Sequence, residues 1–517
     1  MLHLDSKMDR FKEEMKHKLI DTSASFEEQS KLIKYLKILE PDSDPTWECI
    51  TAYHCWLEDI LWKLQEEHFK KVDLLVSMRI FCMLLLVETN ERQLFVSSLV
   101  SILMNKLQSF WKLSNTYTTN DERWTQRQDD INQMLINTIN VSSWLILNAL
   151  VPKALPDDVI KRYEAQFVKW PEMSPQVNRT VLTQSLKALR SFISSLLEAQ
   201  FTNTHVQPLI ELCMTVRLKV VSDVIDKGVE NICALGSKEN WKQDFSSSVA
   251  AKTTLPDFYE NEVFDCLSGV RDALATNGYP GEACLFSRER FRTTLVDIFV
   301  HLVTSIRHCF DRYLTTKKLL ISICNLEFIL ENALKSINKR MFDCGVKYAD
   351  EKAKAKLSQY RQTLVRCYIM IKSSAFLTLI ESANYEYIPD DDVSDYAKEM
   401  MMCCVLQQAE LELCSPQLTS ECLQATVQNA FVNLLDQLEA REPASEREAS
   451  QRVIDICALE QALGGFTNLE TRSVVYKSFF ASQEKLQRCL NNMRASMRMA
   501  MESLEGGAED DLNTSSI

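Results

Sequence analysis

The sequence predicts an all-α protein, an elongated rod of tandem helical bundles. Glycine, which supplies the turns of sheet-rich folds, accounts for only 10 of the 517 residues, whereas its average usage is about 7%. Apolar residues make up 46% of the chain, which is enough for a large core and excludes general disorder. Their spacing is helical in nearly every segment, without the fixed period of about 34 or 40 residues that marks regular helical arrays. Bundles that follow one another therefore fit the sequence best.

The clearest expected helix covers residues 317–342, which contain neither proline nor glycine. Apolar residues recur there at steps of three and four, which places them on one stripe of an α-helix. The stripe consists of Leu319, Ile323, Leu326, Leu330, Leu334, Ile337 and Met341. Further apolar residues beside the stripe leave only a small part of the helix surface polar. Neighbouring elements must therefore pack against the helix on several sides.

The first third of the chain is expected to be a series of helices. Residues 31–39 are amphipathic and end at the EPDSDP break, where Pro45 suits the first turn of a new helix capped by Asp44. Further helices are expected at 45–70, 70–87, 94–111 and 129–151. Polar or proline-marked connectors are expected at 114–121, 152–158 and 171–175.

The remaining two thirds continue the same pattern. The NGYPG sequence at 277–281 is the strongest turn signal, and Gly464-Gly465 stops a helix. Helices are expected at 175–202, 209–236, 257–276, 291–310, 364–380, 396–413, 419–438, 453–463 and 471–501, with a surface loop at 236–255 and an acidic loop at 385–395. We expect helical domains at 1–155, 156–276, 277–388 and 389–505, and an acidic disordered tail at 506–517.

Composition excludes several classes of function. A net charge of −13 argues against non-specific nucleic-acid binding, which needs clustered Lys and Arg. No run approaches the ~20 uninterrupted apolar residues of a membrane span, and the charged N-terminus is no signal peptide. The 17 cysteines contain no CxxC pair, so neither a zinc ribbon nor a secreted disulfide framework is indicated. We therefore expect a soluble intracellular protein.

Three stretches carry a resemblance to a known family. They are Ser25–Leu57, which contains the signature PTWECI, Leu319–Leu334 and Val453–Phe466. In this order they resemble the exocyst complex component 2 family, whose members are tethering subunits and effectors of Ral GTPases. The resemblance implies a rod of consecutive helical bundles that binds other exocyst subunits. It also implies a cytoplasmic protein, recruited peripherally to the plasma membrane and to secretory vesicles, which holds vesicles there before SNARE-mediated fusion.

The chain departs from this family at its beginning. Full-length relatives carry an N-terminal immunoglobulin-like domain that binds Ral, followed by a coiled coil that joins other subunits. No alternating strand pattern of such a domain precedes the helices here. We therefore do not predict Ral binding for this chain. Small GTPases in general are not excluded as partners. We expect the chain to be a fragment, an isoform or a truncated form.

The most prominent candidate site is a basic segment. Residues 312–372 contain thirteen Lys and Arg against five Asp and Glu, a local net charge of +8. The centre of the segment is formed by Lys347, Lys352, Lys354 and Lys356. Such a run predicts a surface for anionic lipid or an acidic partner. The alternative is a solvated helix face, because exposed lysine-rich faces are common.

Three further clusters are weaker candidates. They are the loop Pro389–Asp392, the group Cys49, His54 and Cys55, and the pair Cys403 and Cys404. The loop lacks the glycine and closing glutamate of a calcium site, so helix-start charge is favoured. In the second cluster the first cysteine and the histidine are offset by about 140° on a helix, which argues against a metal. The cysteine pair fits core packing better than redox sensing.

No catalytic signature such as G-x-S-x-G is present, and no cofactor or metal is expected. The sequence therefore predicts a protein that works by binding. Two alternatives stay open: a rod subunit of a related tether at endosomes or the Golgi, and a helical GTPase-regulating enzyme.

Overall fold

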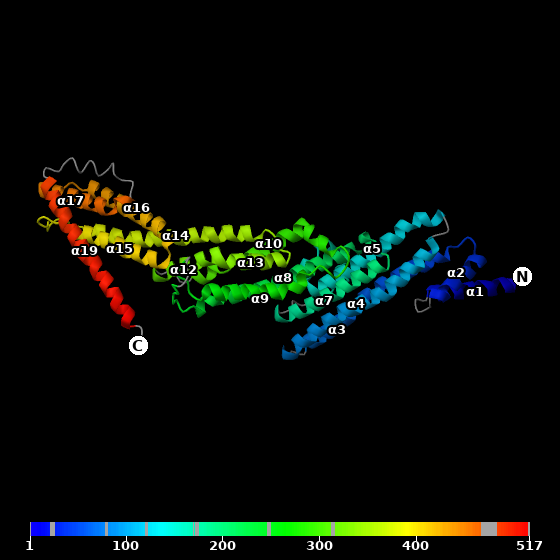
Figure 1. Ribbon diagram of the computed structural model, residues 1–517. Helices are drawn as coiled ribbons and strands as arrows, with labels where there is room; N and C mark the ends of the chain where they lie inside the picture. Colours follow the sequence, from blue (N-terminus) through cyan, green and yellow to red (C-terminus); the bar gives the residue numbers. More distant parts are fainter. Residues whose placement is uncertain are drawn as a thin grey trace. The chain divides into compact units, whose positions relative to one another are not determined.

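The computed structural model describes residues 2–20, 26–77, 81–118, 122–168, 170, 175–245, 250–311, 316–466 and 483–514. Nearly all of these residues are helical (Figure 1). Within them, extended pairing is limited to one isolated bridge between Asp244 and Lys252. The predicted all-α fold class is confirmed.

The helices follow the predicted order except over 45–118, where the three expected helices 45–70, 70–87 and 94–111 are two, one ending at Ser77 and one that runs from Phe81 to Thr118 and includes part of the expected connector 114–121. The first are α1 (Leu2–Ile20), α2 (Phe26–Leu39), α3 (Pro45–Ser77), α4 (Phe81–Thr118), α5 (Glu122–Leu150), η1 (Pro152–Ala154), α6 (Asp157–Arg162) and α7 (Pro175–Glu198). The N–H of Trp47 donates to the Asp44 carboxylate at 3.2 Å, which confirms the predicted cap. The expected break near residue 70 is absent, because no proline or glycine interrupts α3 there.

The second part of the chain contains further long helices with several shorter ones between them. They are α8 (Asn203–Lys238), α9 (Leu255–Leu274), η2 (Glu282–Ser287), α10 (Glu289–Thr304), α11 (Arg307–Phe310), α12 (Thr316–Phe328), η4 (Ile329–Ala333), α13 (Leu334–Asp343), α14 (Ala349–Glu381), α15 (Asp395–Cys414), α16 (Pro416–Ala440), α17 (Glu446–Leu463), η5 (Gly464–Phe466) and α19 (Gln483–Thr514). The first part of the expected helix 471–501 lies outside the described residues. Helix α19 runs on through most of the expected tail at 506–517.

The chain divides into two compact units. The first unit comprises Met1–Val229, Phe264–Leu302 and Arg340–Lys347, and the second comprises Glu230–Val263, Val303–Lys339 and Tyr348–Ile517. In the first unit α3 packs against α4 and α5, and α4 also packs against α7. The four predicted helical domains stay a prediction.

The NGYPG turn of the first unit holds two glycines for different reasons. Gly281 has φ of +81°, a conformation that side chains with a Cβ rarely adopt. A Cβ at Gly278 would lie 2.3 Å from Nε of Arg190. The predicted turn at 277–281 is thus confirmed, and it leads directly into η2.

A buried ion-pair cluster fixes this turn to two long helices. Nε of Arg190 on α7 donates to Glu282 at 2.8 Å, and the fully buried Arg217 on α8 pairs with the same carboxylate. The N–H of Gly278 donates to it at 2.7 Å. Burial raises the pKa of Glu282, but the hydrogen bonds and charges of its partners outweigh burial and hold it below its ordinary value.

The predicted helix 317–342 forms, but with one irregular turn. All seven residues of its expected stripe are buried. Between α12 and α13, residues Ile329–Ala333 form a π turn, in which the N–H of Leu334 bonds to the carbonyl of Ile329. A π turn accommodates one more residue than an α turn, so the stripe stays inward although its central members are spaced by four.

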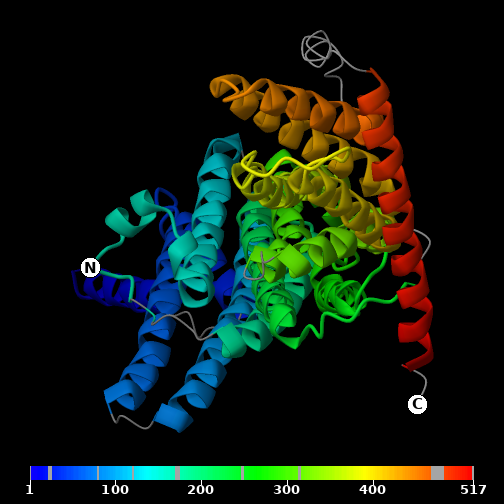
Figure 2. The same cartoon turned by 90° about the vertical axis from the view of Figure 1, so that its left-hand side faces the viewer.

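Helices α14 to α17 form the core of the second unit, and α19 crosses α17 steeply (Figures 1 and 2). Among the described residues, α14 alone is long and apolar enough to cross a membrane by length and composition, with a mean hydropathy of 1.4 in its best window. However, Leu364, Tyr368, Phe376 and Ile380 of α14 are buried, and α14 packs against α12, α15 and α16. We interpret it as a bundle helix.

A buried carboxylate ties the acidic loop 385–395 to this core. Asp455 on α17 accepts hydrogen bonds from the N–H of Ser394 at 2.9 Å, from Gln451 at 3.0 Å and from Tyr385 at 3.3 Å. Burial raises the pKa of Asp455 to about 6, and the hydrogen bonds counteract that rise only in part. The loop is therefore held by its polar groups as well as by the apolar Val393.

Candidate interaction surfaces

The predicted lysines lie at and before the start of α14. Lys352, Lys354 and Lys356 belong to its first turns, and all three are exposed. The exposed Lys347 precedes the helix in the first compact unit, and its ammonium group lies 5.4 Å from the Phe342 ring. Cations near a helix N-terminus oppose the helix dipole, so these lysines are not placed to stabilise α14.

The three helix lysines do not share one face. At about 100° per residue, Lys352 and Lys356 lie about 40° apart, whereas Lys354 lies about 160° from each of them. The buried residues Ala353 and Leu357 occupy the face between the two sides. Lys352 and Lys356 are therefore the pair best placed to meet a single flat surface.

The acidic loop uses its carboxylates to hold neighbouring helices. Asp390 pairs with Arg447 at 2.8 Å, Asp391 with Arg488 at 3.1 Å, and Asp392 with Lys398 at 2.7 Å. These pairs give the carboxylates of the loop cationic partners. Within the described residues, no group of three or more His, Cys, Asp or Glu side chains is placed to hold a metal ion.

The cysteine candidates lie in unreactive surroundings. Cys49 is buried and its thiol faces the carbonyl of Leu19 at 3.7 Å, whereas Cys55 is exposed on another side of α3. Burial raises the pKa of Cys49 to about 11 and that of Cys404 to about 12, so neither is a thiolate at neutral pH. Cys404 and its half-buried neighbour Cys403 belong to the packed face of α15, as core residues do.

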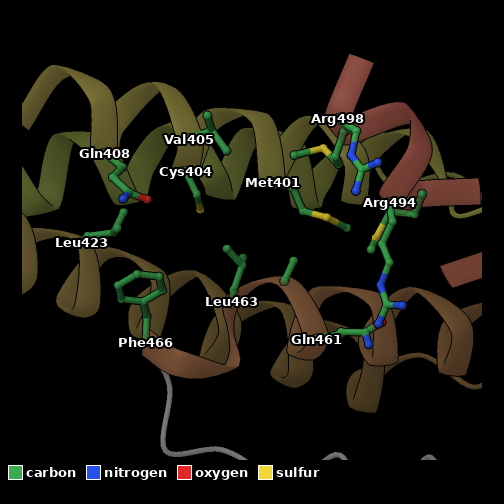
Figure 3. A pocket seen from close by; sticks show the side chains of 13 residues that line it. Met401, Cys404, Val405, Gln408, Leu423, Gln461, Leu463, Phe466, Arg494 and Arg498 are labelled. Carbon is green, nitrogen blue, oxygen red and sulfur yellow. The ribbon is translucent and has the colours of Figure 1, made fainter. Parts of the chain in front are cut away.

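A groove that the sequence did not reveal opens between α15, α17 and α19 in the second unit (Figure 3). Its volume is about 610 Å³. The apolar side chains in its wall are Met401, Cys404, Val405, Leu423, Ala462, Leu463, Phe466, Met493 and Met497. Of its three methionines, Met401 and Met493 are buried and Met497 is half-buried.

Polar side chains border the groove at defined places. Arg494 and Arg498 extend from α19 at one end, and Gln408 and Gln461 lie on α15 and α17 (Figure 3). Both arginines are exposed, and no ion pair joins either of them to another side chain that the structure describes. The only sequence signal was the i, i+4 spacing of Met493 and Met497 beside the two arginines, which also fits an ordinary amphipathic helix.

The sequence matches the family described as "Exocyst complex component Sec5" over residues 3–504. The chain belongs to the Sec5 family of exocyst components. The predicted resemblance is thereby confirmed, and the match includes all three stretches that carried it.

Curated members of this family are similar along the whole chain. "Exocyst complex component 2" of Caenorhabditis elegans is 53% identical, with 100% of this chain and 63% of the relative covered. "Exocyst complex component 2" of Homo sapiens is 21% identical, with 99% and 65% covered, and that of Mus musculus is 21% identical, with 96% and 63% covered. The chain thus spans less than two thirds of the length of these Sec5 relatives.

Proposed function

We propose that this chain is a non-catalytic exocyst subunit that helps to tether post-Golgi secretory vesicles to the plasma membrane before SNARE-mediated fusion. The observation that carries the proposal is the Sec5-family match over residues 3–504. The 53% identity to a relative named as an exocyst component supports it. The protein would be cytoplasmic and recruited peripherally to both membranes.

The mechanism we propose is geometric. A chain made of successive helical bundles offers long helix faces to other exocyst subunits and sets the reach between vesicle and target membrane. Affinity comes from many modest contacts that act together, since linked contacts raise one another's effective concentration. This mechanism needs no chemical step.

Purification of the tagged chain from cells tests this function. We expect the other exocyst subunits to co-purify in stoichiometric amounts. Stoichiometric recovery of an endosomal or Golgi tether instead would replace the proposal by the related-tether alternative. If the purified chain accelerates nucleotide exchange or GTP hydrolysis by a small GTPase, the alternative of a GTPase-regulating enzyme is favoured. Direct binding is tested separately by adding GTP-loaded small GTPases to the same preparation.

We also propose that the lysines at the start of α14 contact anionic membrane. Lys352 and Lys356 share one side of the helix, and each lysine near an anionic surface contributes about 1 kcal/mol. Replacing both by glutamate should lower binding to phosphatidylserine vesicles by at least about tenfold. Lys31 and Lys34 on α2 are exposed as well, so the same double replacement there is the matched control.

The extent of the lysine surface is tested separately. Lys347→Glu or Lys354→Glu is added to the double variant of Lys352 and Lys356. Binding to phosphatidylserine vesicles should weaken further only if the added lysine also contacts the membrane. Binding should also fall with salt, because the attraction is screened within about 8–10 Å at physiological ionic strength. Equal binding by the α14 variant, the α2 control and the unchanged chain would refute the membrane site.

A further inference from the structure

Tyr348, the residue that precedes α14, is not explained by the folding of the chain. Its φ of +70° is a conformation that few residues other than glycine, asparagine and aspartate adopt. It stands at the N-terminus of α14 without the side-chain hydrogen bond that Ser, Thr, Asn or Asp would supply there. Its side chain is 62% exposed, and among the described residues it makes no hydrogen bond and no ring contact. Glycine or asparagine would therefore suit the fold better than this aromatic residue.

Tyr348 stands at one end of an exposed stripe of α14. At about 100° per residue, the stripe comprises the exposed residues that lie within about 40° of Lys352 around the helix axis. They are Tyr348, Lys352, Lys356, Gln359, Thr363, Arg366 and Met370. At the other end of the stripe, Met370 is 66% exposed. The stripe is about 33 Å long and contains cations but no Asp or Glu.

The acidic residues of the first turn of α14 lie to the side of this stripe. Asp350 is about 160° and Glu351 about 100° from Lys352 around the helix. Both positions are in the first turn, where negative charge stabilises the helix dipole. The stripe itself therefore presents positive charge, with an exposed apolar side chain at each end.

The chemistry of the stripe matches the interface of an anionic membrane. Anionic headgroups attract lysine and arginine near the surface. A tyrosine ring can enter the apolar layer beneath the headgroups while its hydroxyl stays in contact with water. An acidic segment of a soluble protein would pair with the cations, but it offers the ring no apolar layer. The combination of cations with an exposed ring thus favours a membrane.

We propose that Tyr348 is a membrane-interface residue, whose ring enters an anionic bilayer when the stripe from Tyr348 to Met370 lies on its surface. The proposal rests on the membrane contact proposed above for Lys352 and Lys356, and it extends that contact along α14 to Arg366 and Met370. The contact also accounts for the backbone at Tyr348, since strained conformations that folding does not require collect at functional sites.

Replacement of Tyr348 by glycine separates the role of the ring from the stability of the fold. Tyr348→Gly should unfold at nearly the temperature of the parent chain, because relief of the strained φ offsets the greater freedom of glycine in the unfolded state. Its binding to phosphatidylserine vesicles, measured by co-sedimentation, should weaken at least about threefold. Tyr348→Trp should bind at least as tightly as the parent, since tryptophan also favours the membrane interface.

The tryptophan variant also reports where the side chain lies. All eight native tryptophans lie at or before Trp241, so the parent chain supplies the background fluorescence to subtract. Vesicles of phosphatidylserine and a lipid with brominated acyl chains should quench the fluorescence that Tyr348→Trp adds. A lack of quenching of this added fluorescence in the bound state would overturn the proposal.

A second tyrosine and a soluble polyanion provide the controls. Tyr387 lies in the acidic loop of the same unit and is 86% exposed, and Tyr387→Gly should leave vesicle binding unchanged. Heparin supplies negative charge without an apolar layer, so Tyr348→Gly should bind it as the parent does. Equal losses in the two glycine variants, or an equal loss of heparin and vesicle binding in Tyr348→Gly, would contradict a role of the ring in the bilayer.

The remaining outcomes separate this proposal from those on which it rests. If K352E/K356E weakens vesicle binding and Tyr348→Gly does not, the tyrosine proposal fails and the lysine contact stands. If the unchanged chain does not bind phosphatidylserine vesicles, both fail. A clearly lower unfolding temperature of Tyr348→Gly would assign the ring a structural role and overturn the proposal. Co-purification of exocyst subunits tests the tethering function independently of all these results.

Discussion

Replacement of Asp455 by asparagine should make the second unit less sensitive to pH. The pKa of Asp455 is raised by burial from 3.8 to about 6. The folded state therefore holds a proton that the unfolded chain releases between about pH 4 and pH 6, so stability falls as pH rises through this window. A shift of about two pKa units corresponds to about 3 kcal/mol.

The structure explains why asparagine is a suitable replacement. The N–H of Ser394 and the amide of Gln451 both donate to Oδ1, which asparagine retains. Tyr385 faces Oδ2 at 3.3 Å, and its hydroxyl can accept a hydrogen bond from an amide in that place. Asp455→Ala, in contrast, leaves a buried N–H without a partner and should destabilise by about 2–3 kcal/mol at every pH.

Hydrogen exchange of peptides that contain Ser394 is the appropriate assay. All eight tryptophans lie at or before Trp241, so tryptophan fluorescence reports poorly on this region. We measure the opening free energy of the parent relative to that of Asp455→Asn. This difference should fall by about 2 kcal/mol between pH 4 and pH 7, because part of the change already occurs below pH 4. A difference that is independent of pH, or that grows in favour of the parent as pH rises, would refute the reasoning.

Three other predictions concern single side chains. Glu327→Ala removes a buried carboxylate that pairs with the half-buried Arg361 and accepts a hydrogen bond from the Ser415 hydroxyl. It should destabilise the second unit by about 3 kcal/mol, seen as faster amide exchange in α12. Cys55 is exposed and Cys404 is buried, so iodoacetamide at pH 8 should modify Cys55 at least about 100-fold faster. Gly281→Ala should destabilise the first unit by about 1 kcal/mol by thermal unfolding, because its φ is +81°.

Each of these predictions has a matched control. Glu327→Gln keeps the hydrogen bonds and should cost less than Glu327→Ala, so equal losses would contradict the role given to the carboxylate. Modification of Cys404 at the same rate as Cys55 in the folded chain would contradict its burial. Gly464 has φ of −60° and no atom within 4 Å of an added Cβ, so Gly464→Ala should not destabilise. A loss as large as that of Gly281→Ala would contradict the backbone argument.

Local sequence patterns were sufficient where the physics is local. The apolar stripe from Leu319 to Met341 is buried throughout, as spacing by three and four requires. The cap at Asp44, the turn at 277–281 and the helix end before Gly464 depend on a few adjacent residues, and all three formed as predicted. The π turn at 329–333 was not predicted, because a spacing of four is compatible with both kinds of turn.

Features that join distant residues were not predictable from the same patterns. Glu282 follows a turn and resembles a surface residue, but Arg190 and Arg217 reach it from helices far earlier in the chain. Asp455 is a single carboxylate within a run of apolar residues. Such a position is compatible with an exposed helix side as well as with a buried one, so the sequence did not predict its burial. The lysine segment was found by counting charges along the sequence. The count does not show that Lys354 lies on a different side of α14 from Lys352 and Lys356, which follows only from the helix geometry.

The π turn between α12 and α13 also determines where the chain can change length. The π turn at Ile329–Ala333 contains one residue more than an α turn. Deletion of one residue there would restore an α turn, and the buried faces of both flanking helices would keep their orientation. The same deletion elsewhere in α12 would rotate everything after it by about 100° and turn Ile337 away from its neighbours. Insertions and deletions in related chains should therefore gather at this turn.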